Sequence, residues 1–411
     1  MSKTIDIAVI GGGAAGFFTA INAARLQPGL RIVIFEKGRE VLSKLRISGG
    51  GRCNVTHHCF EPEQLAASYP RGSRMLRWNF EAFQPEDTIE WFRERGVKLK
   101  AEEDGRMFPV TDSSETIVNC LTREAEKFRV NVRTCTAVKS VEPTSQGSFL
   151  VHLKGEKAVR ASRVVIAAGG FSREASYGWI KQLGHTIRTP VPSLFTFNFR
   201  DKIFADLAGI SIEDAAVSIS GLNYAERGPV LITHWGLSGP AILKLSSFAA
   251  RDLHQMEYRF EIEVNWLGKR DEQSVRLQLI SFREEHPRQK MQKQNLFPFP
   301  SRLWIRFLEL AGIDPGQRWA DLSNKEIHNL LQKLLRGTYS IQGKSTYKEE
   351  FVTCGGVDLG EVNPGTLESR IIPGLYFTGE ILDIDGITGG FNFQAAWTNS
   401  WLAAHDLAAA F

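Results

Sequence analysis

The sequence predicts an α/β protein, in which a second domain of strands and helices is inserted into a Rossmann-type nucleotide-binding domain. Three observations support this fold class. The chain opens with a strand, a glycine-rich turn and a helix. Its middle third alternates apolar and polar residues, as half-exposed antiparallel strands do, and a glycine-rich α/β pattern returns near the C-terminus. We therefore expect residues 1–190 and 341–411 to form the nucleotide-binding domain around an insertion at 191–340.

The composition is that of an ordinary globular protein with more than one core. The chain has 411 residues, of which 43% are hydrophobic and 23% charged, and chains above about 250–300 residues usually split into domains. Apolar runs such as Val164–Ala168 are too short to cross a bilayer, and the N-terminus lacks a signal-peptide pattern. We expect a cytoplasmic protein without a membrane partner. A net charge of +4 does not by itself imply nucleic acid, and we expect none.

The cysteines predict neither a disulfide framework nor a metal site. Their number is odd and no CxxC pair occurs; they are Cys53, Cys59, Cys120, Cys135 and Cys354. The simplest interpretation is a set of small, reduced residues.

The first half of the chain predicts the parallel sheet. Ile5–Ile10 is a short apolar strand, Ala14–Leu26 is a helix ended by Pro28-Gly29, and Arg31–Phe35 is the next strand. This βαβ order implies a right-handed crossover. Helices are expected between Pro62 and Arg95 and over Thr111–Phe128, the latter beginning near Asp112 or Ser113. Further strands are expected at Val130–Cys135, Phe149–Leu153 and Arg163–Ala167.

The insertion is expected to be β-rich over 191–265 and helical over 266–340. Its alternating segments are Leu194–Phe199, Ala215–Ser220, Val230–Thr233 and Tyr258–Val264. The segment Trp266–Arg306 carries nine Lys or Arg against four Asp or Glu. After the insertion we expect a strand at Leu375–Phe377 and a final helix from about Asn392 to Ala409.

The turn after the first strand carries a dinucleotide-binding motif. Gly11, Gly13, Ala14, Ala15 and Gly16 give G-x-G-x-x-G between a strand and a helix. In this motif the first glycine permits the tight turn, the second lets the backbone approach a pyrophosphate, and the third lets helix and sheet pack closely. Glu36, twenty residues further on and followed by Lys37, is placed to accept hydrogen bonds from ribose hydroxyls. NAD and FAD both fit this motif.

Two further glycine-rich segments favour FAD. A basic loop, expected to cradle phosphate or the pyrimidine edge of a flavin, contains Lys44, Arg46, Ser48, Gly49, Gly50, Gly51, Arg52, Cys53 and Asn54. Near the other end, Gly379 and Glu380 follow a strand, and Glu380 is expected to bind ribityl hydroxyls. Gly389, Gly390, Phe391 and Asn392 then open the last helix, whose N-terminus would stabilise negative charge on a reduced flavin. Ala168 and Gly169, after the buried strand, complete the expected cofactor contacts. No second strand–GxGxxG–helix unit occurs, so a dedicated nicotinamide domain is not expected.

The order of four motifs resembles that of the YhiN/BaiN-like flavoprotein family. The motifs are Lys44–Asn54, Thr233–Pro240, Thr353–Val357 and Gly379–Gln394, and the resemblance covers nearly the whole chain. It implies non-covalently bound FAD and a glutathione-reductase-like FAD fold interrupted by a β-barrel-like and helical insertion. It also implies a site where the insertion meets the flavin. Cys354 and Phe391 differ from the pattern, which has a small residue without a thiol and a tyrosine at these positions.

These features predict an FAD-dependent oxidoreductase that transfers hydride through flavin N5 to or from a small organic substrate. Flavin supplies the electron chemistry and the protein positions the substrate. His234, whose ordinary pKa suits proton transfer near neutrality, and Arg106 are the candidate catalytic residues. NAD(P)H is a candidate transient donor; dioxygen or the substrate itself are alternatives. Asp383 and Asp385 flank a glycine, where aspartate is ordinarily a turn former.

Two other functions have partial support in the sequence. A serine hydrolase built on Ser238 fails, because Gly236–Pro240 is not G-x-S-x-G. An FAD-binding module without redox activity, whose basic helical segment binds RNA or a protein, is the alternative function. A charged helical run is more often a solvated face.

Overall fold

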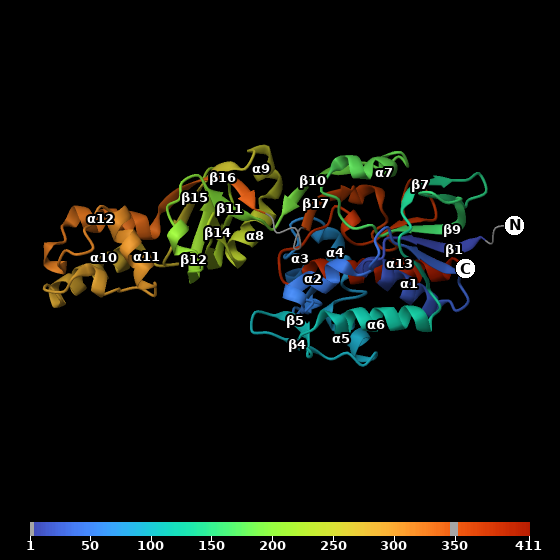
Figure 1. The fold of residues 1–411 in the computed structure, drawn as a ribbon, viewed down its shortest axis with the longest axis horizontal. Helices are drawn as coiled ribbons and strands as arrows, with labels where there is room; N and C mark the ends of the chain where they lie inside the picture. The colour runs from blue at the N-terminus through green and yellow to red at the C-terminus, as the bar shows by residue number, and fades with distance from the viewer. Residues whose placement is uncertain (1–3, 346–351) are drawn as a thin grey trace. The chain divides into compact units, whose positions relative to one another are not determined.

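Figure 1 shows the computed structural model of the chain, which describes residues 4–345 and 352–411. The described chain divides into two units. The first combines the residues up to Ser193 with the C-terminal part from Val352, and the second runs from Leu194 to Ser345. Each unit has its own hydrophobic core. Among the helices described, none has both the length and the apolar character needed to cross a membrane.

A seven-stranded sheet organises the first unit, in the order β6-β2-β1-β9-β8-β7 with β18 also paired to β9. The parallel strands are β1 (Ile5–Ile10), β2 (Ile32–Phe35), β6 (Asn131–Arg133), β9 (Val159–Ile166) and β18 (Leu375–Phe377). The strands β7 (Val138–Pro143) and β8 (Phe149–Leu153) continue it antiparallel. Ile10 pairs with Phe35 on one side and Ile166 on the other. The predicted parallel Rossmann sheet is confirmed, and the carboxyl ends of its strands share one edge.

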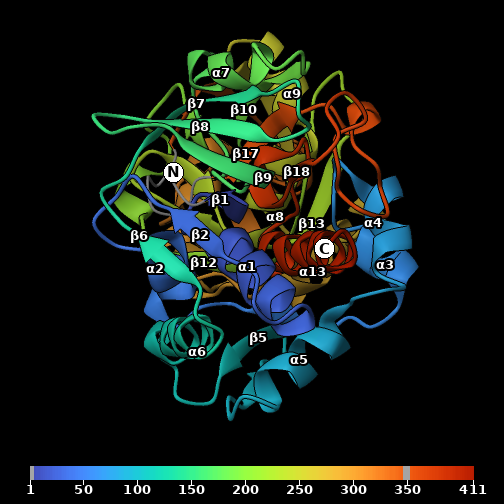
Figure 2. The same cartoon turned by 90° about the vertical axis from the view of Figure 1, so that its right-hand side faces the viewer.

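Two long helices cover the same face of this sheet. Figure 2 shows α1 (Ala14–Leu26) beside α13 (Phe391–Ala409), although they lie near opposite ends of the sequence. The Ser400 hydroxyl donates to the Ala15 carbonyl at 3.0 Å. The first turn of α1 is thereby fixed to the last helix.

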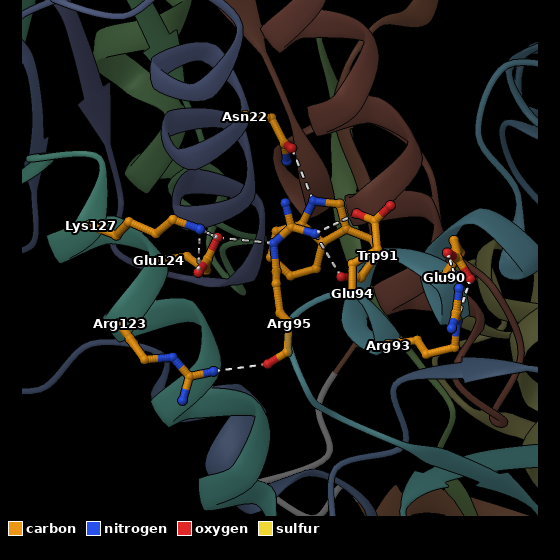
Figure 3. A network of polar contacts seen from close by, with 9 residues as sticks. All are labelled: Asn22, Glu90, Trp91, Arg93, Glu94, Arg95, Arg123, Glu124 and Lys127. Atoms are coloured by element: carbon orange, nitrogen blue, oxygen red, sulfur yellow. Dashed lines mark hydrogen bonds and ion pairs between the residues drawn. The ribbon is translucent and has the colours of Figure 1, made fainter.

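A buried polar network holds α1 against the helices below it (Figure 3). Asn22 of α1 accepts a hydrogen bond from the Trp91 indole at 3.0 Å. Arg95 lies over the Trp91 ring, 3.8 Å from its centroid, and pairs with Glu124 at 3.1 Å. Because Trp91 belongs to α5 (Pro85–Arg93) and Glu124 to α6 (Ser114–Lys127), this network joins three helices.

Shorter elements complete the first unit. They are α2 (Ser43–Gly51), β3 (Thr56–His57), α3 (Pro62–Ala66), α4 (Ser73–Asn79), β4 (Leu99–Ala101), β5 (Arg106–Pro109), α7 (Gly178–Lys181), β10 (Ile187–Ser193) and β17 (Val352–Val357). The interpretation of 44–54 as a loop throughout was wrong in its first part, because Ser43–Ile47 is helical. The helix breaks at Ser48, with ψ 147°, and at Gly49 and Gly50, with φ +58° and +67°.

The second unit is a closed barrel with helices attached. The barrel order is β11-β14-β13-β12-β15-β16, with β11 (Thr196–Phe199), β12 (Ser211–Ile219), β13 (Ala225–Ile232), β14 (Gly236–Ser238), β15 (Arg259–Asn265) and β16 (Gly337–Ser345). The helices are α8 (Pro240–Phe248), α9 (Ala250–Gln255), α10 (Glu272–Glu285), α11 (Ser301–Leu310) and α12 (Asn324–Leu335). The expected β-barrel-like and helical architecture is confirmed.

Candidate functional site

The loops that leave the carboxyl edge of the sheet bring the predicted segments together. Gly11 follows β1 with φ +115°, and a Cβ there would lie 2.3 Å from the Ala167 carbonyl oxygen. Gly379 follows β18, and a Cβ there would lie 2.8 Å from Cβ of Ala15. Ligands of open parallel sheets bind at such an edge. The first glycine motif and the C-terminal motif therefore lie side by side at this edge.

The N-terminus of α1 faces open space. Gly13 is its N-cap, no side chain among the described residues caps it, and an added Cβ at Gly13 would meet no atom within 4 Å. A Cβ at Gly16, by contrast, would lie 2.0 Å from the Gly11 carbonyl oxygen. Uncapped N–H groups at a helix start bind anions. This helix start has the free donors and the room that a phosphate needs.

Glu36, after β2, is held by the glycine loop. One carboxylate oxygen accepts from the Gly12 N–H at 2.8 Å and the other from the Gly38 N–H at 2.7 Å. Lys37 lies over the Phe171 ring, with Nζ 5.7 Å from its centroid. Phe171 comes two residues after Gly169, so the segments after β2 and β9 meet.

The cations of 44–54 already have carboxylate partners. Lys44 Nζ lies 2.6 Å from Glu380 Oε2, which joins this segment to the C-terminal motif. Arg46 pairs with Glu115 at the start of α6. Arg52 pairs with Glu102 at 2.6 Å and lies over Phe108, 4.0 Å from its centroid. The two arginines therefore brace this segment against its neighbours.

In the rest of 44–54, some residues are held by hydrogen bonds and others have free space around them. The Ser48 carbonyl accepts from the Cys53 N–H at 3.0 Å, and Asn54 Oδ1 accepts from the Met107 N–H at 3.3 Å. Burial raises the pKa of the Cys53 thiol to about 12, so this thiol stays protonated at neutral pH. An added Cβ at Gly50 or Gly51 would meet no atom within 4 Å.

The start of α13 resembles that of α1 in lacking a side-chain cap among the described residues, but it is more closely packed. Gly390 has φ +91°, no described side chain caps the helix, and a Cβ there would lie 2.4 Å from the Thr56 carbonyl oxygen. Next to it, the Phe391 ring stacks on His57 with centroids 4.4 Å apart. The Asn392 side chain accepts from the Gly386 N–H at 2.8 Å and donates to its carbonyl at 3.0 Å. Asn392 thus closes the 386–392 loop.

Two buried hydroxyls at this edge lack a hydrogen-bond partner among the described residues. Thr378 directly precedes Gly379, and Thr353 Oγ1 would lie 2.6 Å from a Cβ at Gly170. Within the described part of the chain, both hydroxyl oxygens are buried without a hydrogen bond. An unpaired buried hydroxyl costs about 1–3 kcal/mol. These hydroxyls, with two uncapped helix starts, fit a dinucleotide that carries a polar ring.

Sequence reasoning missed two features of this region. Asp385, interpreted as a turn former, is instead fully buried; Arg71 Nε donates to it at 2.5 Å and the Ser193 hydroxyl at 2.8 Å. Local spacing could not signal this pair, because Arg71 lies 314 residues away. His57 was missed as well; its Nδ1 lies 2.9 Å from the Gly389 carbonyl oxygen, and burial lowers its pKa.

The two candidate catalytic residues lie in different units. Arg106, on β5, pairs with Asp104 at 2.6 Å and with Glu102 at 3.1 Å, and it shares Glu102 with Arg52. His234 belongs to the second unit, at the exposed turn between β13 and β14. A pocket there is lined by the turn and by the segment after β11, including Arg200, Lys202 and Trp235.

Comparisons with known proteins extend over the whole chain. The family described as HI0933-like protein Rossmann domain matches residues 5–406. A ribosomal RNA dihydrouridine synthase of Escherichia coli is 31% identical over 99% of both chains. A 3-dehydro-bile acid delta(4,6)-reductase of Clostridium scindens is 28% identical over 98% of both. The 3-ketosteroid delta1-dehydrogenase of Sterolibacterium denitrificans shares the fold, with a TM-score of 0.53 at 12% identity, covering 99% of this chain and 100% of that one.

Proposed function

This chain belongs to the HI0933-like family of FAD-binding oxidoreductases, and from this premise we propose that it saturates a carbon–carbon double bond conjugated with a carbonyl group. The names of two relatives share this chemistry. One is a reductase of delta(4,6) bonds in a 3-dehydro-bile acid, and the other forms dihydrouridine in ribosomal RNA. By ordinary chemistry, reducing the delta(4) bond of a 3-oxo steroid or the ring double bond of uridine adds hydrogen to a double bond conjugated with a carbonyl group. Because the family consists of oxidoreductases, we do not retain the alternative of an FAD-binding module without redox activity.

One observation carries the proposal: among the described residues, the starts of α1 at Gly13 and of α13 at Gly390 have no side-chain cap, and an added Cβ at Gly379 would lie 2.8 Å from Ala15 of one helix and 4.0 Å from Ala396 of the other. FAD, when bound, supplies hydride transfer at N5. The start of α1 would hold its pyrophosphate, and the start of α13 would hold the polar edge of the ring, where negative charge develops on reduction. Glu36 and Glu380 would accept from ribose and ribityl hydroxyls.

Saturating such a bond also requires a proton for the carbon next to the carbonyl group. His234, an exposed imidazole at the turn between β13 and β14, is the proposed donor. Arg106 is the proposed cation for the carbonyl oxygen. NAD(P)H is the proposed electron donor, binding without a motif of its own.

Product analysis tests the proposed reaction. The protein is incubated without oxygen with NADPH or NADH and, separately, with a 3-oxo-delta(4,6) steroid acid or a uridine-containing RNA. We expect mass spectrometry to find a product with two added hydrogen atoms from at least one substrate, and none from the saturated analogues. Products with unchanged mass in every reaction would contradict the proposal.

A further inference from the structure

The turn between β13 and β14 presents two aromatic side chains, His234 and Trp235, whose rings have no partner among the described residues, on a backbone held by hydrogen bonds. The Thr233 hydroxyl accepts from the Gly236 N–H at 3.0 Å, and the Thr233 N–H donates to the Gly236 carbonyl at 2.8 Å. A Cβ at Gly236 would lie 1.9 Å from the Phe197 carbonyl oxygen, so only glycine fits there. These hydrogen bonds hold His234 and Trp235 at the tip.

Trp235 is the most exposed large apolar side chain of the described chain, at 68%. Across residues 4–345 and 352–411, its ring has no aromatic or cationic partner. Burying an indole ring contributes substantially to the free energy of folding, and an exposed ring does not make this contribution. An indole ring on a rigid turn is therefore positioned for a ligand, because exposed aromatic faces stack on planar rings.

Two cations line the same pocket as this ring. The Trp235 carbonyl accepts from the Phe199 N–H at 2.9 Å, which places the turn next to the end of β11. Arg200 and Lys202 follow, and both line the pocket with His234, Trp235 and Asp201. In the part of the chain that the structure describes, neither cation has a carboxylate partner. This differs from Arg46 and Arg52, whose charges are taken up by Glu115 and Glu102.

The backbone that carries the cations is also fixed. The Arg200 N–H donates to the Ser340 carbonyl of β16 at 2.9 Å. The pocket thus combines a stacking face, two unpaired cations and one acidic acceptor, Asp201. A flat ring with an attached phosphate matches this set, because the ring can stack on the indole and the phosphate can pair with the cations.

We propose that this pocket binds a nucleotide, with its base on Trp235 and its phosphate at Arg200 and Lys202. The ribose or an exocyclic amine would donate to Asp201. The nucleotide has two sources consistent with this chemistry: a residue of single-stranded RNA or the electron donor NAD(P)H. Whether the pocket holds the substrate or the electron donor rests on the proposed function. It departs from our expectation, based on net charge, that nucleic acid is not a partner.

Binding measurements without turnover test the site. The oxidised holoenzyme is titrated into a fluorescein-labelled ten-nucleotide oligouridylate, followed by anisotropy, and NADPH is titrated separately by calorimetry. For Trp235→Ala we expect the Kd of at least one probe to rise roughly 5- to 100-fold, the range for removing one stacked base. For Arg200→Gln with Lys202→Gln, RNA affinity should fall. The salt dependence of that affinity should weaken by a slope of about 0.7 for each phosphate that is no longer neutralised.

Matched controls separate the site from general effects. Trp78→Ala removes another exposed indole, 60% exposed in the first unit, and Lys325→Ala removes an exposed cation of the second unit. In both control variants, the affinities for oligouridylate and NADPH should stay within twofold of wild type. The absorbance of bound FAD should equal that of wild type in every variant. If the pocket variants lose only RNA binding, the nucleotide that the pocket binds is a residue of RNA. If they lose only NADPH binding, it is part of the electron donor. If Trp235→Ala binds both probes as tightly as wild type, the inference about the pocket is wrong, but the proposed reaction is unaffected. If the wild-type protein reduces none of the substrates, the proposed reaction is wrong, but the inference about the pocket is unaffected.

Discussion

At the residue scale, Glu36 links the proposed ribose contact to the shape of the glycine loop. Its carboxylate accepts from the N–H groups of Gly12 and Gly38. Hydrogen bonds to a charged group contribute about 1.5–3 kcal/mol. We therefore predict that Glu36→Ala weakens FAD binding about tenfold or more, and that losing these two hydrogen bonds also lowers the unfolding temperature of the FAD-free protein. Fluorescence titration of apoprotein with FAD measures this. Glu36→Gln keeps one acceptor and should lose less; equal FAD affinity in wild type and Glu36→Ala would remove the role.

The buried pair of Arg71 and Asp385 makes a second prediction at this scale. Burial raises the pKa of Asp385, while Arg71 lowers it. Removing one partner of a buried pair costs about 3–5 kcal/mol, so Arg71→Ala should lower the free energy of unfolding by that amount at neutral pH. The double variant Arg71→Ala with Asp385→Asn should recover much of it, because no buried charge remains. Denaturant unfolding measures both.

The pH dependence of this loss has a definite sign. With its pKa raised in the folded state, Asp385 favours the protonated form there, so its ionisation reduces stability as pH rises above the unfolded value of about 3.9. In Arg71→Ala the opposing cation is gone, and the deficit should shrink as pH falls toward about 4. A deficit that stays constant from neutral to acid pH would show that Asp385 is not the cause.

Single residues also show what the sequence could and could not predict. The glycines of the first motif were predictable, because their spacing follows from a local turn. The partners of Arg46 and Arg52 were not, because Glu115 and Glu102 lie 69 and 50 residues away. Both arginines were expected to cradle phosphate or the pyrimidine edge of a flavin, and a local pattern gives no information on such distant carboxylates.

At the element scale, the turn from β1 to α1 allows two glycines to be compared. Gly11 has φ +115° and would clash with Ala167, whereas Gly13 has open space around it. We predict that Gly11→Ala lowers the free energy of unfolding by at least about 2 kcal/mol, from strain and overlap. Gly13→Ala should leave the FAD-free protein as stable as wild type, yet weaken FAD binding roughly 10- to 100-fold by filling the phosphate space.

Thermal unfolding of the apoproteins and FAD titration distinguish these two effects. If Gly13→Ala binds FAD like wild type, the start of α1 is not the pyrophosphate site. If Gly11→Ala is as stable as wild type, the close approach to Ala167 does not constrain this turn.

Elements with a clear period were predictable and short or polar ones were not. The strands β11, β12, β13 and β15 follow the alternation seen in the sequence, and α13 begins one residue before the expected start. The strand β14 has three residues, and β16 is largely polar and contains two glycines. Their strand structure comes from barrel closure through pairing with β11, β13 and β15.

At the scale of the whole molecule, the fold class follows from patterns that repeat along the chain. Two separate cores form because the apolar positions change from the period of a buried parallel sheet to that of a half-exposed barrel and back. The substrate was not predictable from such patterns. In our proposal, specificity depends on a few side chains such as Trp235, which has no aromatic or cationic partner among the described residues, and Arg200, which has no carboxylate partner there.

The visible absorption spectrum of the purified protein, recorded without oxygen, tests the central claim most directly. NADPH or NADH is added first, and a conjugated enone second. We predict flavin bands that bleach with the donor and return with the enone, but not with the saturated ketone. A colourless protein that also refuses added FAD, or a reduced flavin that the enone leaves bleached, would contradict an FAD-dependent reductase of conjugated double bonds.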